Sequence, residues 1–177
     1  MRNAVLFIAM SLDGLIASPD GSVDWLGGQD AGSNDFGSYE RFIAGVSDIV
    51  MGDTTYRQLT TELMPGAWPY AAQTTYVLTH RKDEPEQTGI VFTQEPVDLL
   101  IGRLKAQPGG EIWICGGASV ANQCMRRGLI DRFHINVMPT LRGAGIRLFE
   151  ALNQPIPLRL ISTEQYNGIV DLVYGVR

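Results

Sequence analysis

Short apolar runs rich in Val, Ile and Phe recur along the chain, and they constrain its fold more than any other feature of the sequence. Runs of this length, apolar throughout rather than alternating, are typical of strands that are covered on both faces of a sheet. Segments with the apolar spacing of a helix lie between most of them. The runs that we expect to form strands are residues 4–10, 48–51, 75–78, 90–93, 112–115 and 133–138.

Two intervening segments carry a clear helical pattern. Residues 35–45 place Phe36, Tyr39, Phe42 and Ile43 on one face, and the segment after Pro96 does the same with the residues Val97, Leu100, Ile101 and Leu104. Alternation of strands and helices predicts an α/β fold of three α/β/α layers with a mainly parallel central sheet. At the end of the chain two apolar runs flank Asn167-Gly168, which predicts an antiparallel hairpin at one edge of that sheet.

Length, charge and cysteine content narrow the classes of protein. A chain of 177 residues, 45% of them hydrophobic, has room for one core, so we expect a single domain over residues 1–177. The net charge of −5 and scattered cations exclude a nucleic-acid partner of the usual basic kind. No run reaches membrane-spanning length, which predicts a soluble, cytoplasmic protein. Cys115 and Cys124 lack metal-ligand spacing and are interpreted as thiols of the core, with no metal site.

Ligands of such sheets bind beyond the carboxyl ends of the strands, so the residues that follow each strand are the ones to inspect. These segments, 11–17, 52–56, 79–82 and 115–119, combine small residues, hydroxyls and cations, which suit a polyphosphate. Gly116-Gly117 ends a strand and opens a helix, where bare N–H groups bind phosphate. Because neither a Rossmann nor a P-loop motif occurs, we expect a nucleotide site of another kind.

Four motifs in order resemble the dihydrofolate reductase superfamily, in particular its branch related to the reductase domain of the riboflavin-biosynthesis deaminase-reductase. They are residues 9–17 (AMSLDGLIA), 47–56 (SDIVMGDTTY), 114–119 (ICGGAS) and 128–131 (GLID), the last followed by Pro139 and Gly143. The resemblance covers nearly the whole chain. It implies a dihydrofolate reductase-like fold and an NADPH-dependent reductase.

The resemblance also implies which residues bind the cofactor. Arg81 is expected to select NADPH, because a guanidinium grips a phosphate at two points. The implied contacts are Ala9, Ile16 and Ala17 at the nicotinamide, Gly52, Thr54 and Thr55 at phosphate, Thr79, His80 and Arg81 at the 2′-phosphate, and Gly116, Gly117, Ala118 and Ser119 at the pyrophosphate.

Hydride transfer to a C=N or C=O bond leaves an atom that needs a proton, so a carboxyl group is expected near the acceptor. Asp13 and Asp35 are the candidate catalytic residues. Asp13 is also a candidate for substrate contact, with an Asx turn as the alternative, and Asp35 has the alternative of a helix N-cap. Trp25 is expected to form a wall of the substrate pocket or to be an ordinary core aromatic, and His134 is expected to be structural.

Two positions depart from the pattern of the family. Asp53 stands where a basic residue is frequent, and it would repel a 2′-phosphate that it faced. Cys115 stands where the riboflavin branch usually has Glu, which favours a pteridine-like substrate, with dihydrofolate the leading candidate. A riboflavin-pathway-type pyrimidine reductase and a non-catalytic nucleotide-binding protein are the alternatives. The hairpin at the sheet edge also favours a homodimer.

Overall fold

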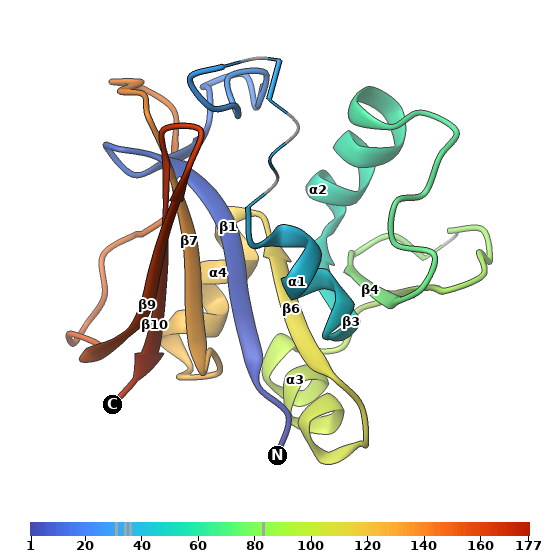
Figure 1. Ribbon diagram of the computed structural model, residues 1–177. Coiled ribbons are helices and arrows are strands. Elements are labelled where there is room, and N and C mark those ends of the chain that lie inside the picture. The colour runs from blue at the N-terminus through green and yellow to red at the C-terminus, as the bar shows by residue number, and fades with distance from the viewer. Residues whose placement is uncertain (31, 34, 36, 83) are drawn as a thin grey trace.

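The computed structural model describes residues 1–30, 32–33, 35, 37–82 and 84–177. Its centre is an eight-stranded sheet with the order β5-β4-β3-β6-β1-β7-β10-β9 (Figure 1). The strands are β1 (Ala4–Ser11), β3 (Val46–Gly52), β4 (Thr74–Leu78), β5 (Ile90–Thr93), β6 (Glu111–Gly116), β7 (Arg132–Met138), β9 (Leu158–Tyr166) and β10 (Ile169–Val176), and β2 (Leu15–Ala17) pairs with β8 (Ile146–Arg147) in a small second sheet.

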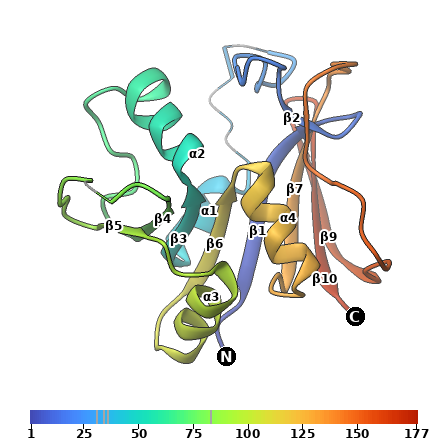
Figure 2. The same cartoon turned by 180° about the vertical axis from the view of Figure 1, so that it is seen from behind.

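Helices cover both faces of the large sheet. On one face lie α1 (Tyr39–Ala44) and α2 (Asp53–Gln58), the latter continued by a π-helical segment (Leu59–Leu63). On the opposite face lie α3 (Val97–Ala106) and α4 (Ala118–Arg126), as the view from behind shows (Figure 2). We call these the α1/α2 face and the α3/α4 face. The three layers confirm the predicted α/β/α fold.

The strands pair as the sequence pattern predicted. Neighbouring strands from β5 through β7 are parallel, and β10 and β9 add two antiparallel strands at the edge. Asn167 and Gly168 both have positive φ angles, 46° and 76°, which is the backbone of a type I′ hairpin turn. Every predicted strand is present, and the predicted helix after Pro96 buries its whole apolar stripe on the α3/α4 face.

The helix predicted over residues 35–45 is shorter than expected. It begins at Tyr39, with Ser38 at the N-cap, so the expectation that Asp35 caps this helix is wrong. The Asp35 carboxylate instead accepts a hydrogen bond from the N–H of Gly37 at 2.9 Å, and the φ angle of +56° at Gly37 interrupts a helical backbone. Phe36 lies outside the described residues.

Within the described part of the chain, no helix is both long and apolar enough to cross a membrane. Cys124 is a buried core residue of α4, and Cys115 is partly buried on β6. Both are unpaired thiols, in agreement with the prediction of core cysteines.

Candidate cofactor and substrate site

Two helices begin directly at the carboxyl ends of neighbouring parallel strands. Gly52, the last residue of β3, is the N-cap of α2, and Gly117, next after β6, is the N-cap of α4. Because glycine has no side chain, neither helix start carries a side-chain cap. A Cβ added at Gly117 would lie 3.4 Å from the Thr55 hydroxyl, so the two helix starts lie close together. The structure thus brings together two sets of uncapped N–H groups suited to phosphate.

The residues predicted at phosphate lie around these two helix starts. Thr54 and Ser119 are exposed in the first turns of α2 and α4, and Ala118 is partly buried beside Ser119. Gly52 approaches the other helix, because a Cβ there would lie 3.3 Å from a methyl group of Val120. Larger residues at the two glycines would fill the space between the helix starts. The donor set and the open backbone therefore fit a pyrophosphate.

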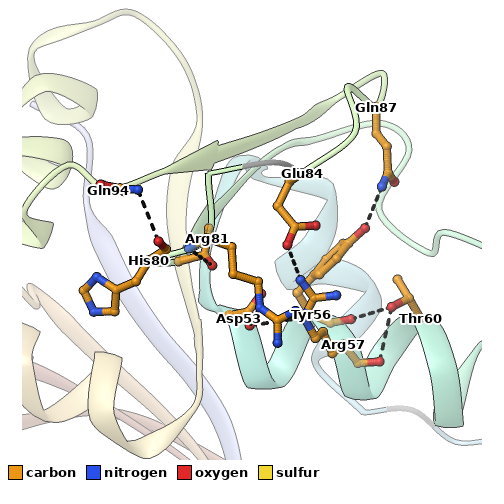
Figure 3. A network of polar contacts seen from close by, with 10 residues as sticks. Asp53, Tyr56, Arg57, Thr60, His80, Arg81, Glu84, Gln87 and Gln94 are labelled. Carbon is orange, nitrogen blue, oxygen red and sulfur yellow. Dashed lines mark hydrogen bonds and ion pairs between the residues drawn. The ribbon is translucent and has the colours of Figure 1, made fainter.

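A network of ion pairs lies beside the start of α2 (Figure 3). The guanidinium of Arg57 contacts Asp53 at 3.2 Å, from Nε to Oδ2, and also contacts the Glu84 carboxylate. Arg81 approaches the same Oδ2 atom of Asp53 at 3.4 Å through its Nε atom. The hydrogen bond to Asp53 is the main cause that raises the pKa of Arg57. Asp53 therefore faces two arginines, a set of contacts that the sequence pattern did not show.

The loop after β4 holds the residues predicted at the 2′-phosphate. Thr79 is buried, and its hydroxyl accepts a hydrogen bond from the N–H of Arg81 at 3.2 Å. The side chains of His80 and Arg81 are exposed, and the His80 carbonyl accepts a bond from Gln94 (Figure 3). An open cavity of about 580 Å³ lies between this loop and β5, with Arg81 and Gln94 in its lining. The loop offers a cation near the start of α2, where Arg81 contacts Asp53, and the cavity lies on its other side, against β5.

The residues predicted at the nicotinamide come from β1 and β2. Ala9 lies on β1, opposite Asn136 of β7 in the sheet register. Ile16 and Ala17 lie on β2, where Ile16 packs against the core of the α3/α4 face and Ala17 is buried. Their contact with a nicotinamide stays a prediction.

Asp13 joins the loop after β1 to the loop after β7. Its carboxylate accepts hydrogen bonds from the Ser11 hydroxyl at 2.6 Å and from the N–H groups of Arg142 at 3.1 Å and Gly143 at 2.7 Å. These bonds, first the one from Ser11, lower the pKa of Asp13 to about 2. A carboxyl group with such a pKa is ionised at neutral pH, which argues against Asp13 as a proton donor. Contact of Asp13 with substrate stays a prediction.

Trp25 lies beside the same pair of loops. The Arg142 guanidinium stands over its ring, 5.3 Å from the centroid, and donates a hydrogen bond to the Ser18 hydroxyl at 2.9 Å. The indole N–H of Trp25 is buried and has no hydrogen-bond partner in the described part of the chain. Trp25 is therefore partly buried under a cation, and its role as a substrate wall stays a prediction.

An aromatic cluster covers the middle of the α1/α2 face. Tyr70 packs edge-on against Trp68 and Trp113, with ring centroids 5.3 Å apart in both pairs. The Tyr70 side chain also contacts the thiol of Cys115, and burial raises the pKa of that thiol to about 12. Trp68 and Tyr70 come from the loop before β4, whose course the sequence did not predict. Tyr70 and Trp113 are buried in the core of this face, and Trp68 is the partly exposed member of the cluster.

A second polar cluster, absent from the sequence prediction, lies under the start of α1. The Asp171 carboxylate accepts hydrogen bonds from the Ser38 hydroxyl and from the Asn136 amide, the latter at 2.8 Å. His134 Nε2 lies 2.8 Å from Asp171 and 2.9 Å from the Ser38 hydroxyl. All four side chains are buried. The sequence signal for this cluster is the presence of polar residues within apolar strands, namely His134 and Asn136 at alternate positions of β7 and Asp171 in β10.

These strands and helix starts define a reductase-like domain of the dihydrofolate reductase-like fold. A family model described as the RibD C-terminal domain matches residues 2–171, and the chain belongs to that family. YwjB of Bacillus subtilis (strain 168) is 39% identical over 173 residues, which cover 98% of this chain and 97% of YwjB.

Solved structures share the fold. A protein of Shewanella sp. PV-4 that is named for riboflavin biosynthesis is 28% identical and aligns with a TM-score of 0.84, over 100% of this chain and 99% of that one. A deaminase/reductase of Thermotoga maritima, named for diaminohydroxyphosphoribosylaminopyrimidine and 5-amino-6-(5-phosphoribosylamino)uracil, is 14% identical, with a TM-score of 0.74. The alignment covers 99% of this chain and 57% of the Thermotoga chain.

The comparisons confirm the resemblance to the riboflavin branch. They support the alternative of a riboflavin-pathway-type reductase-like domain, and they do not support dihydrofolate as the substrate. Cys115 in place of the usual Glu therefore does not exclude the chain from the riboflavin branch. One residue in a motif changes a contact, whereas the family match extends over residues 2–171.

Proposed function

We propose that residues 1–177 form one NADPH-dependent reductase domain whose substrate is a small heterocycle of the pyrimidine type. The observation that carries the proposal is the pair of uncapped, glycine-led helix starts at the carboxyl ends of β3 and β6, in a chain of the RibD C-terminal domain family. A dinucleotide has two phosphates to place, and such an edge supplies N–H donors without competing side chains.

The cofactor residues then divide by position along this edge. Gly116 and Gly117, with Ala118 and Ser119, would bind the pyrophosphate together with the start of α2. Arg81 would meet the adenosine 2′-phosphate, and Ala9 would lie beneath the nicotinamide. Bound NADPH supplies a hydride for the substrate. The chain itself has to hold the acceptor atom close, exclude water and direct a proton to it.

Trp68, the partly exposed member of the aromatic cluster, favours a planar substrate on the α1/α2 face. Of the two predicted proton donors, Asp13 is held ionised, so we propose that it orients the substrate loop. Asp35, exposed at the turn before α1, remains our candidate acid, directly or through water.

The test is a titration of the purified protein with NADPH, followed by tryptophan fluorescence. The pyrimidine intermediate named in the Thermotoga enzyme and dihydrofolate are then added in turn, and the absorbance of the reduced nicotinamide is recorded. Oxidation of NADPH when the pyrimidine is added supports the proposal. Oxidation of NADPH with dihydrofolate alone would make a pteridine, and not a pyrimidine, the substrate class. Binding without oxidation by either would favour a non-catalytic nucleotide-binding protein, and no binding would refute the cofactor assignment.

We also propose a homodimer in which β9 takes part. This edge strand is nine residues long, and its residues Leu160 and Ile161 are 54% and 50% exposed. An apolar edge of this kind is a template for pairing with a second chain.

A further inference from the structure

The arginines beside the start of α2 are already paired with carboxylates (Figure 3). Arg57 contacts Asp53 and Glu84, and Arg81 contacts Asp53. Two guanidinium groups therefore face two carboxylates in this network. A phosphate that approaches Arg81 meets a cation whose charge Asp53 already balances, so its attraction is smaller than Arg81 alone would provide.

Asp53 also has an unused acceptor. Both arginines contact its Oδ2 atom, whereas Oδ1 is buried and has no hydrogen-bond partner in the part of the chain that the structure describes. An ionised carboxylate accepts hydrogen bonds and donates none. A ribose hydroxyl that takes the place of the Arg81 side chain can donate to the Oδ2 atom, but a phosphate dianion offers acceptors and negative charge. Asp53 thus favours a hydroxyl over a phosphate by its chemistry.

Arg81 is placed to move aside for such a ligand. Its side chain is 61% exposed, and its contact with Asp53 is an ion pair of 3.4 Å. Exposed pairs of this kind contribute little stability, so a ligand can displace Arg81 at small cost. Arg57 is held more firmly, because it is less exposed and contacts two carboxylates.

We propose that Asp53 sets the cofactor preference of this chain. It lowers the affinity for an adenosine 2′-phosphate and accepts a 2′-hydroxyl in its place, so that the site binds NADH nearly as well as NADPH. This inference rests on the proposed function, because it takes the adenosine end of the cofactor to lie beside Arg81.

Two probes without nicotinamide isolate this effect. Adenosine 2′,5′-bisphosphate and 5′-AMP differ only in the 2′-phosphate, and their affinities can be measured by isothermal titration calorimetry at fixed ionic strength. We expect the wild-type protein to bind both within about threefold. Asp53→Asn removes the charge at nearly constant size, and we expect it to tighten the bisphosphate about tenfold, or about 1.4 kcal/mol, and to weaken 5′-AMP.

Glu84→Gln is the matched control. It changes the charge of the same network by the same amount, but Glu84 contacts Arg57 and not Arg81. We expect the ratio of the two affinities to change less than twofold. Circular dichroism checks that each variant is folded, and Asp53→Ser repeats the test with another residue suited to a first helical turn.

The outcomes separate the two proposals. Binding of both probes with an unchanged ratio in Asp53→Asn overturns the role of Asp53 and leaves the cofactor site. An equal change of the affinity ratio in Glu84→Gln also overturns it, because the net charge of the network, and not Asp53 in particular, would then set the ratio of the two affinities. Absence of binding to the wild type and to all three variants removes the cofactor site itself, and the role of Asp53 with it.

Discussion

Replacement of Asp171 by alanine tests whether the buried cluster under α1 stabilises the fold. Asp171 is 1% exposed, and its carboxylate accepts hydrogen bonds from Ser38 and from Asn136. A hydrogen bond to a charged group contributes about 1.5–3 kcal/mol. Ser38 keeps a partner in the variant, because its hydroxyl also lies 2.9 Å from His134 Nε2. Asn136 loses its bond of 2.8 Å.

We therefore expect Asp171→Ala to lower the free energy of unfolding by about 3 kcal/mol, which is a large part of the 5–15 kcal/mol of an ordinary domain. For a chain of this size the melting temperature should fall by roughly 6–12 °C. Urea unfolding followed by tryptophan fluorescence measures the loss, and an unchanged m-value would show that the unfolded state is the same.

Glu164→Ala is the control for this experiment. Glu164 lies opposite Asp171 in the register of β9 and β10, but its side chain is 51% exposed and pairs with the exposed Arg41. We expect a loss below about 1 kcal/mol. The reasoning is refuted if Asp171→Ala also costs less than about 1 kcal/mol, since the cluster would then contribute no more than a surface pair.

Three further predictions follow from contacts already described. The pKa of Asp13 falls from 3.8 to about 2 on folding, so its contribution to stability is present above pH 4 and is lost as the pH falls towards 2. When the free energy of unfolding is measured across this range, the values for the wild type and for Asp13→Asn should therefore converge at low pH. Burial raises the pKa of Cys115 and Cys124 to about 12, so both thiols should react slowly with a disulfide reagent at pH 8, and rapid reaction of either in the folded protein would contradict this. Leu160→Lys on β9 should shift the mass measured by light scattering towards the monomer; an unchanged dimer would place the interface elsewhere.

The sequence predicted the elements whose signals are local. The strands could be located because each is a short apolar run, and the hairpin because Asn-Gly is suited to two positive φ angles. The start of α1 was misplaced because Asp35 and Ser38 are both acceptable N-caps. The choice between them depends on Gly37 and on the contacts of Ser38 with Asp171 and His134, which lie 133 and 96 residues away along the chain.

The same distinction holds for the candidate site. The glycine pair was found because it marks a change from strand to helix, and its position beside Gly52 followed from parallel pairing. The contacts around Asp53 were not predicted, because Arg81, which contacts Asp53, and Glu84, which contacts Arg57, belong to a loop that begins 26 residues after Asp53. The sequence shows an acidic residue, Asp53, where a basic residue is frequent in the family, but it does not show which cations balance the charge of this carboxylate.

The hydrogen bonds of the Ser38 hydroxyl connect the start of α1 to strands far away in the sequence. With six residues, α1 is far below the length at which a helix is stable by itself, and its first turn depends on Ser38, whose hydroxyl is bound to Asp171 of β10. Separation of the β9–β10 hairpin from β7 would therefore remove one of the two hydrogen-bond partners of Ser38, while α1 stays attached through His134 of β7 and through Phe42, which stacks on Phe7 of β1. In native-state hydrogen exchange, the amide of Phe42, which donates to the Ser38 carbonyl, should therefore exchange faster in Asp171→Ala than in the wild type.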